Sequence, residues 1–478
     1  MAATISSLGI GSGVLTADTI DKLKANDTAN VIAPIDRKIA LNQQKGQALD
    51  LLNSLLTTFK ANASSLSDDT LYQKRTVSGN TSDVSVTALS GTTIQSFSIS
   101  NVQLAQKDVI ESGSFATSLT SVLNPTTLAD PLFTNGTLNL AVNGKTYSIN
   151  YDKTSTLESL QASINTAAGT DVTASILQTG SAAFNLVVTS KVTGLNQAIT
   201  LTDMNGGLAT QLTPPLVPTT PPDTTRLQTL QKAQDASFNY NGIPVTRSTN
   251  TINDLVDGVT KSVTINLLQN TTNSSTISIT QNKQIIADSV QGLSTGYNSL
   301  MKQLDDMTLT DLANGKAGIF NGDNTIKSIK REITKMMTSV NSQGYSLAQY
   351  GIGLDEKGTM SFTQSAFDTQ MNANPTGLEG FFSGFTDSKG TYTEGVFGNL
   401  DALLNSYTKA NGLMGTLTDA SKHDLKSLND GKARSQALIE ARYATMSARF
   451  AAYDSMISQF NAQFSSLQQQ ITAANKGA

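Results

Sequence analysis

The sequence predicts an α+β protein of several domains, in which two helical ends enclose a β-rich middle. Its 478 residues exceed the size of ~250 residues at which one core stops growing. Apolar residues recur every three or four positions near both ends and alternate with polar residues in between. This order of helix, strand, strand and helix is typical of domains inserted inside one another, with both termini in the helical part.

The composition excludes several classes of function. Charged residues make up 15% of the chain and the formal net charge is −4, which provides no basic footprint for nucleic acid. Cysteine is absent and His423 is the only histidine, so a zinc site or a His-dependent nucleophile is not expected. His423 stands in a polar helical run and is interpreted as a solvated surface residue. We expect no catalytic residue, no metal and no cofactor.

The amino-terminal stretch gives an expectation about location. Residues 1–13 have neither a basic stretch nor a continuous apolar run, so a cleavable secretory signal is not expected. No stretch approaches the ~18 uncharged apolar residues that cross a bilayer. The protein is expected to stay in the cytoplasm or to leave by a route that uses no such signal.

Three stretches carry the spacing of a helix with one narrow apolar stripe. The sets are Leu49, Leu52, Leu56, Phe59, Ala63 and Leu66; Ile286, Val290, Leu293, Tyr297, Leu300, Leu304 and Met307; and Ile439, Tyr443, Met446, Phe450, Tyr453, Ile457, Phe460, Phe464, Leu467 and Ile471. The last set is the longest and resembles a coiled-coil seam. Such a stripe is either the seam of an intramolecular helical hairpin or a surface for assembly.

Strands are predicted between about residues 77 and 285. Apolar and polar residues alternate over 84–88 and 97–101, and Asn143-Gly144 and Asn241-Gly242 each indicate a tight hairpin. A capping pair after each hairpin predicts a short helix, with Ser155 and Glu158 in the first and Thr251 and Asp254 in the second. Five of the ten prolines lie in residues 214–222, which are predicted to form an extended connector.

Two other motifs contain residue types that can bind ligands. The glycines of residues 9–13 resemble a phosphate-binding loop, but no strand precedes them and no acidic residue follows at the required spacing. Asp305-Asp306 and residues 321–324 contain oxygen ligands for calcium but not the dense loop of an EF-hand. Helix capping by Asp323 or Asn324 before Ile326 is the favoured interpretation.

Four patches, in order along the chain, resemble the flagellar filament-capping protein family (hook-associated protein 2). They are LGIGSG at 8–13; ASFNYNGI at 236–243 with TRSTNTI at 246–252 and DGVT at 257–260; GIGLD at 351–355 with KG at 357–358, Phe362, NP at 374–375 and FF at 381–382; and RFAAYDSMIS at 449–458. The second patch is the most specific. Thr363 stands where the family's aspartate is expected.

The resemblance implies an arrangement of domains. Terminal helices in residues 1–45 and 436–478 pair as a coiled coil, and residues 46–77 and 286–435 form a helical leg domain. Residues 78–118 and 236–285 form an inner β-rich head domain, into which an outer β-rich head domain of residues 119–235 is nested. The fold class is therefore α+β multidomain.

The resemblance also implies a function. The protein would be a secreted structural cap, not an enzyme, at the distal end of the bacterial flagellar filament, required for filament elongation and motility. A self-assembled ring, a pentamer or hexamer, would promote the insertion and folding of flagellin beneath it. Further implied partners are hook–filament junction proteins and a flagellar export chaperone at the C-terminal helix; nucleic acid and a membrane span are not implied. Export would follow the flagellar type III route.

The expected contact residues of the oligomer or filament are the stripe from Ile439 to Ile471 and an N-terminal stripe formed by Leu49, Leu52, Leu56 and Phe59. Two alternatives remain open. One is a hook–filament junction protein or a minor flagellin. The other is a surface adhesin (cell adhesion) whose outer head domain binds a host or glycan ligand.

Overall fold

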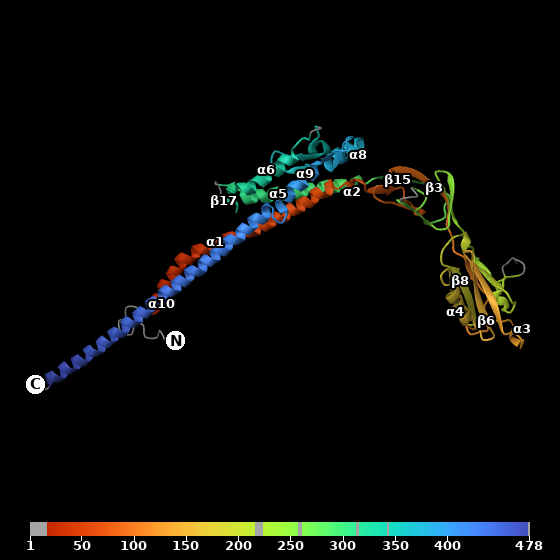
Figure 1. The fold of residues 1–478 in the computed structure, drawn as a ribbon, viewed down its shortest axis with the longest axis horizontal. Coiled ribbons are helices and arrows are strands. Elements are labelled where there is room, and N and C mark those ends of the chain that lie inside the picture. Colours follow the sequence, from red (N-terminus) through yellow and green to blue (C-terminus); the bar gives the residue numbers. More distant parts are fainter. Residues whose placement is uncertain (1–16, 216–222, 257–260, 312–314, 342–343, 477–478) are drawn as a thin grey trace. The chain divides into compact units, whose positions relative to one another are not determined.

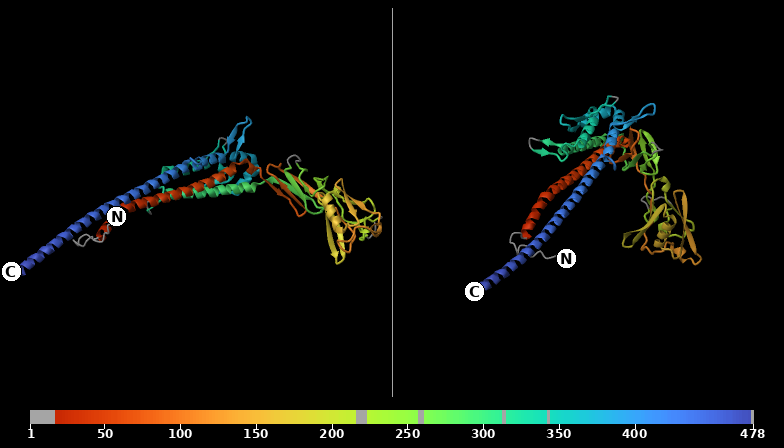
Figure 2. Two further views of the ribbon diagram at one scale, coloured as in Figure 1. Left: turned by 60° about the horizontal axis from the view of Figure 1, so that its bottom comes forward. Right: turned by 60° about the vertical axis from the view of Figure 1, so that its left-hand side comes forward.

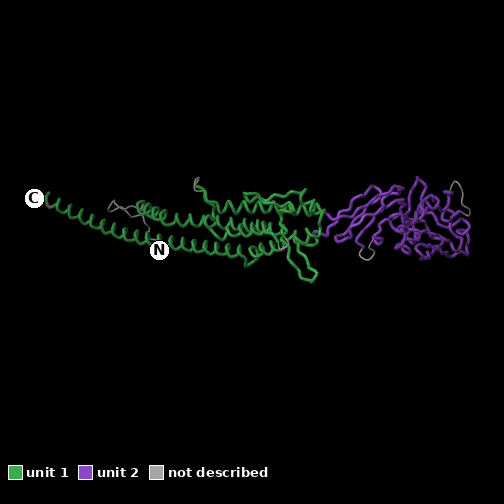
Figure 3. Tube along the Cα trace, turned by 90° about the horizontal axis from the view of Figure 1, so that it is seen from above, with its two compact units in different colours: residues 1–71, 283–478 green, residues 72–282 purple. Residues whose placement is uncertain are grey.

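The computed structural model describes residues 17–215, 223–256, 261–311, 315–341 and 344–476. It divides the chain into two compact units (Figure 3). Unit 1 comprises Met1–Leu71 and Lys283–Ala478, and unit 2 comprises Tyr72–Asn282. Long terminal helices pack together in unit 1 and sheets make up unit 2, so the predicted α+β multidomain class is confirmed.

Unit 1 is built from helices and three small hairpins (Figure 1). Its helices are α1 (Ala17–Ser67), α2 (Asp69–Tyr72, ending at the boundary of the unit), α5 (Lys283–Thr308), α6 (Asn324–Met337), α7 (Gln364–Ala373), α8 (Pro375–Phe382), α9 (Val396–Thr408) and α10 (Leu413–Lys476). The hairpins are β16 (Thr310–Asp311) with β17 (Lys316–Ala317), β18 (Ile352–Leu354) with β19 (Met360–Phe362), and β20 (Gly384–Thr386) with β21 (Tyr392–Glu394). A 3-10 turn, η3 (Leu347–Tyr350), precedes β18.

The apolar stripes of α1 and α5 meet in the core of unit 1. The ring of Phe59 lies 6.0 Å from the ring of Tyr297, and both side chains are fully buried. A β-carbon on Gly296 would stand 2.8 Å from the Asn62 amide nitrogen, so glycine lets the two helices approach closely. Each buried large apolar side chain contributes ~1.5–3 kcal/mol, which makes this contact the stable part of the unit.

Polar side chains begin two helices of this unit, and a third helix lacks such a cap. Asp323 precedes α6 and accepts hydrogen bonds from the backbone N–H groups of Thr325 and Ile326, which confirms the predicted capping role. Asn374 accepts from the N–H of Gly377 at the start of α8. Thr363 precedes α7 without any side-chain hydrogen bond to the helix.

The inner part of unit 2 packs a five-stranded antiparallel sheet against a three-stranded one. The first has the order β1 (Arg75–Ser78), β15 (Ser275–Gln281), β3 (Gln95–Gln103), β11 (Ala236–Tyr240) and β12 (Ile243–Arg247). The second has the order β13 (Thr251–Ile252), β14 (Val263–Leu267) and β2 (Val84–Ala88). Their alternating inward residues, among them Phe97, Phe238 and Ile277, form one buried core.

The outer part of unit 2 has its own core between two sheets and a helix. One sheet has the order β10 (Gln228–Gln231), β4 (Val109–Glu111), β8 (Ala183–Ser190) and β7 (Val172–Gly180); the other has β6 (Lys145–Asp152), β5 (Asn135–Val142) and β9 (Thr200–Asp203). Helix α4 (Leu157–Ala168) covers this core, and the short elements are α3 (Pro125–Ala129), η1 (Leu195–Gln197) and η2 (Thr210–Leu212).

A buried aspartate joins the two parts of unit 2. Asp108 accepts hydrogen bonds from the backbone N–H groups of Ile199 and Ala233, each at 2.8 Å. Ile110 and Phe115 pack in the outer core, so the chain has entered the outer part by β4. The predicted division into four domains stays a prediction. The proline-rich connector lies largely outside the described residues.

Both predicted hairpins are present. Asn143 and Gly144 have φ of 52° and 70°, and Asn241 and Gly242 have φ of 49° and 82°, as a two-residue turn of this kind requires. The predicted alternation over residues 97–101 is wrong at its end. Asn101 takes a positive φ of 54°, and the pairing of β3 with β11 shifts register there.

Two predicted helix starts are wrong. The cap of α4 is Thr156, which exchanges hydrogen bonds with Ser159, whereas Ser155 bonds to the backbone N–H of Asp152. Thr251 opens no described helix, because Ile252 pairs with Ile265 and its side chain is buried in the inner core. Residues 257–260 of that prediction lie outside the described residues.

A nearly buried carboxylate ties the Asn143-Gly144 hairpin to the end of α4. Asp171 accepts hydrogen bonds from the hydroxyl of Tyr147 and from Lys145, whose Nζ lies 2.9 Å away. The Tyr147 hydroxyl and then the Lys145 ammonium hold the pKa of Asp171 far below its ordinary value. The ionised carboxylate is therefore part of the folded outer core.

Acid should destabilise the outer part of unit 2 through Asp171. Because the folded state depresses its pKa, the stabilisation is present above the unfolded pKa of about 4 and is lost as the pH falls below it. Asp171→Asn should lower the melting temperature at pH 7 by a few degrees and should weaken its fall between about pH 5 and pH 3. Calorimetry across pH measures both effects; an unchanged acid dependence would assign it to other carboxylates.

Thr363→Asp should stabilise α7. An aspartate oxygen can accept from the exposed N–H groups of the first helical turn and is favoured by the helix dipole, together about 0.5–1 kcal/mol. Denaturant unfolding of the full chain measures this gain. Thr363→Ala is the matched control and should change stability little, since the threonine hydroxyl makes no capping bond.

Candidate assembly surface

Helices α1 and α10 pair in antiparallel orientation in unit 1 (Figures 1 and 2). Asn42 faces Ser421 and Lys24 faces Glu440, so the chain directions oppose each other. Helix α10 has 64 residues and α1 has 51. Beyond the region beside Lys24, α10 continues to Lys476.

Polar contacts set the register of this pair. Lys24 Nζ lies 2.6 Å from Glu440 Oε2, and Lys432 Nζ lies 2.7 Å from Asp36 Oδ1. Each such exposed ion pair contributes only ~0–1 kcal/mol. The seam is therefore specific in register but weak.

Asp27 lies near the start of α1 and is the centre of one of these contacts. This end of the α1–α10 pair is called its lower part. Its Oδ2 accepts from Arg442 at 3.0 Å and from the hydroxyl of Tyr443 at 2.9 Å. Burial, and then the hydrogen bond to Asp27, raise the pKa of Tyr443 above its ordinary value. The phenol is therefore protonated and donates to the carboxylate.

The carboxyl-terminal stripe divides into a covered and an exposed part. Tyr443 is buried, and Ile439, Met446 and Phe450 are half-buried. The rest is exposed, with exposed fractions of 56% for Tyr453, 38% for Ile457, 67% for Phe460, 70% for Phe464, 54% for Leu467 and 55% for Ile471. A single helix thus presents six large apolar side chains to solvent.

The predicted N-terminal stripe lies elsewhere. Leu49, Leu52, Leu56 and Phe59 are 0–2% exposed in the core of unit 1, packed by α5 and α9. In this chain they hold the helices of the unit together. They offer no surface to another molecule.

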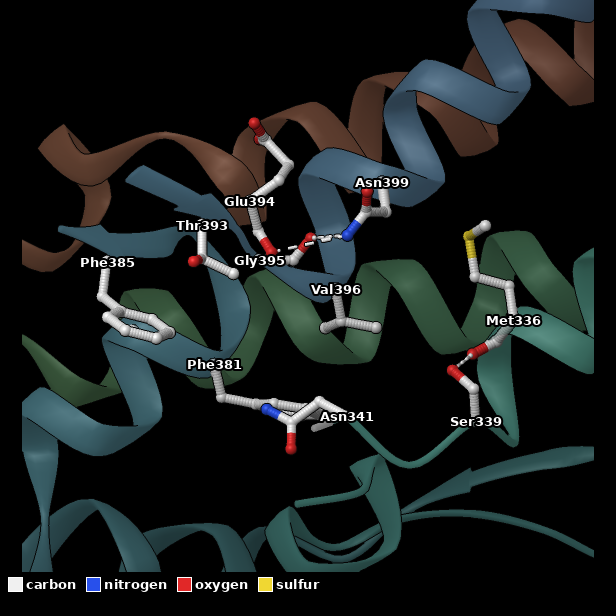
Figure 4. A pocket seen from close by; sticks show the side chains of 11 residues that line it. Met336, Ser339, Asn341, Phe381, Phe385, Thr393, Glu394, Gly395, Val396 and Asn399 are labelled. Atoms are coloured by element: carbon white, nitrogen blue, oxygen red, sulfur yellow. Dashed lines mark hydrogen bonds between the residues drawn. The ribbon is translucent and has the colours of Figure 1, made fainter. Parts of the chain in front are cut away.

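A hollow lies among α6, α8, α9 and the β20–β21 hairpin (Figure 4). Its volume is about 310 Å³, and Phe381, Phe385 and Val396 line it. The amide of Asn399 donates to the backbone oxygens of Glu394 and Gly395 beside it. Glu394 is the one ionisable residue among those lining this hollow, so no acid–base pair is assembled there.

Two of the acidic residues named as possible calcium ligands form ion pairs instead. Asp305 pairs with Lys330 and Asp306 with Lys302, and His423 is exposed on α10. Among the described residues no three His, Cys, Asp or Glu side chains gather as a metal site would require. No helix in the described ranges is both long and apolar enough to span a membrane.

Sequence reasoning missed a second surface of α10. Leu438, Arg442, Thr445 and Arg449 recur at three or four residues and line a groove of about 640 Å³ together with Ala441, Met446, Phe450 and Tyr453. The signal was the same spacing as in the stripe, one position earlier. Arg442 and Arg449 interrupt the apolar pattern of this set, so the sequence did not indicate an apolar surface there.

Comparison with known proteins identifies the family. The family models "Flagellar hook-associated protein 2 C-terminus" and "Flagellar hook-associated protein 2 N-terminus" match residues 233–462 and 12–108. The flagellar hook-associated protein 2 of Campylobacter jejuni is 32% identical over 84% of this chain and 68% of its own length. The chain belongs to the flagellar hook-associated protein 2 family. A "Flagellin hook IN motif" matches residues 137–192.

Other hook-associated protein 2 relatives agree over different lengths. The protein of Salmonella typhimurium is 26% identical over 99% of this chain and 100% of its own. The protein of Helicobacter pylori is 36% identical, but over 51% of this chain and 37% of its own. A crystal structure of the flagellar cap protein domains D1-D2-D3 from Escherichia coli matches with a TM-score of 0.52 at 23% identity, covering 78% of this chain and 99% of the other, and supports the fold.

Family membership decides the broad function. The chain is a flagellar cap protein, a structural component of the extracellular flagellum and not an enzyme. The hook-associated protein 2 assignment also separates it from the junction-protein and minor-flagellin alternatives. The resemblance predicted from the four sequence patches is confirmed.

Asp27→Ala should loosen the lower part of the α1–α10 pair. It removes the partner of Arg442 and of the Tyr443 hydroxyl, at a cost of about 0.5–1 kcal/mol. Hydrogen exchange of residues 17–35 should accelerate several-fold, with little change in the core around Phe59. Asp21→Ala is the control because Asp21 is exposed and makes no ion pair with a described residue. Equal effects of both variants would contradict a register role for Asp27.

Proposed function

We propose that copies of this cap protein assemble into a ring at the distal end of the filament through the exposed part of the α10 stripe, from Tyr453 to Ile471. The observation that carries the proposal is the exposure of six large apolar side chains on one face of a single helix. Isolated helices are marginal in water, and contiguous apolar faces of this kind usually mark interaction sites.

The charge pattern of the same segment supports packing against identical copies. Residues 455–475 contain no Asp, Glu, Lys or Arg. Copies related by rotation about one axis bring identical side chains to the same height, where like charges would repel. A segment of Gln, Ser, Asn and apolar residues avoids this repulsion.

The ring, a pentamer or hexamer, would hold flagellin beneath it during insertion and folding, and so permit filament elongation and motility. Hook–filament junction proteins are the proposed partners at the base on which the cap first assembles. An export chaperone is proposed to cover the stripe from Tyr453 to Ile471 before assembly, because an exposed apolar helix face promotes aggregation. The chain contains no cysteine, so no disulfide opposes export as an unfolded chain by the flagellar type III route.

Replacement of Phe460, Phe464 and Leu467 by Ser should abolish the ring while the monomer stays folded. These side chains are 54–70% exposed, so their loss removes little internal packing. Light scattering should show a loss of the oligomer, and circular dichroism melting should be nearly unchanged. A strain carrying the variant should lose motility.

The matched control is Gln459→Ser, Gln463→Ser and Gln470→Ser, which lie about 80–120° around the same helix from the stripe. This variant should assemble and move as the wild type does. A normal ring in the Phe460, Phe464 and Leu467 variant would refute the proposed contact. Collapse of its melting transition would instead assign the stripe to an internal core.

A further inference from the structure

Helix α5 packs along one face of α1 in unit 1. The Asn62 amide donates to the carbonyl of Gly292, and Phe59 contacts Tyr297, so the two helices run antiparallel. Because the residue numbers of the two helices run in opposite directions, the end of α5 at Thr308 lies beside about residue 48 of α1. Below that point the same face of α1 has no such partner in the described part of the unit.

The same face of α1 continues below the end of α5. Leu41 and Lys45 are four residues apart, and Leu52 and Phe59 follow at steps of seven, so all four side chains share one face. Leu52 and Phe59 are fully buried, whereas Leu41 is 47% exposed. Leu41, Lys38 and Lys45 line a hollow of about 280 Å³ with Asp424 and Leu428 of α10.

The two hollows beside α10 belong to one surface. Leu428 lines the hollow beside Lys45, and Arg442 and Arg449 line the groove of about 640 Å³. These three α10 residues are separated by multiples of seven, which places them on one face of the helix. Both hollows therefore lie along one face of α10, and together they are called the groove.

The groove combines apolar surface with positive charge. Leu41 and Leu438 are exposed in it, and Met446, Phe450 and Tyr453 contribute further apolar surface. Lys38, Lys45, Arg442 and Arg449 line it against one carboxylate, that of Asp424. Arg442 is paired with Asp27, whereas Lys38, Lys45 and Arg449 form no ion pair with a described residue.

We propose that this groove is a docking site for an amphipathic helix with acidic flanks, supplied by another protein. Helix α5 provides the precedent for the shape of the occupant, because it fills the upper part of the same face of α1 with one apolar stripe. Lys38, Lys45 and Arg449, which form no ion pair with a described residue, select the charge of its flanks. The groove shares Tyr453 with the proposed ring contact, whereas Leu438 and Arg449 lie outside the stripe, so changes at these two residues report on the groove alone.

Two synthetic helical peptides with the same leucine stripe test the site, one flanked by glutamate and one by lysine. The full chain should bind the glutamate peptide saturably, one peptide per chain, by fluorescence anisotropy. The lysine peptide should bind at least about tenfold more weakly. Arg449→Glu should reduce this preference several-fold, and Leu438→Gln should weaken the binding of both peptides.

Ala444→Glu is the matched control, because Ala444 is exposed at the same level of α10 but does not line the groove. It should leave both affinities unchanged. Equal binding of the two peptides, or equal weakening by Ala444→Glu and Arg449→Glu, would overturn the proposal, and so would displacement of both peptides by a second copy of the chain. Ring formation by the Leu438 and Arg449 variants, followed by light scattering, reports separately on the proposed function.

Discussion

The unequal pairing of α1 and α10 determines what unit 1 can present to other molecules. Above Leu49, α1 is enclosed by α5, α9 and α10, and its apolar stripe is buried. Below that level only α1 and α10 pair, through a seam in which ion pairs and hydrogen bonds replace much of the apolar contact. Beyond that pair α10 continues with an exposed stripe. One helix therefore changes from core element to exposed surface along its length.

Local patterns predicted the elements well because local forces fix them. The Asn-Gly turns need only two residues that tolerate a positive φ, and the stripes of α1 and α5 need only helical spacing. The helix start predicted at Thr251 was wrong because burial of Ile252 in the inner core contributes more free energy than a capping pair can provide. The structural roles of Asp108 and Asp171 could not be predicted, because the residues that hydrogen-bond to them are distant in sequence.

The spacing of apolar residues alone does not tell whether a helical stripe is buried or exposed. Leu52 and Phe464 belong to stripes of the same period, yet one is fully buried and the other is 70% exposed. Nothing in either stripe distinguishes them, because the difference lies in the neighbouring helices.

Weak contacts hold the lower α1–α10 pair together. Pro34 removes one backbone hydrogen bond from the interior of α1, and exposed ion pairs near it contribute little. Stability is concentrated instead around Phe59 and Tyr297. The core around Phe59 and Tyr297 therefore does not depend on the contacts of the lower α1–α10 pair.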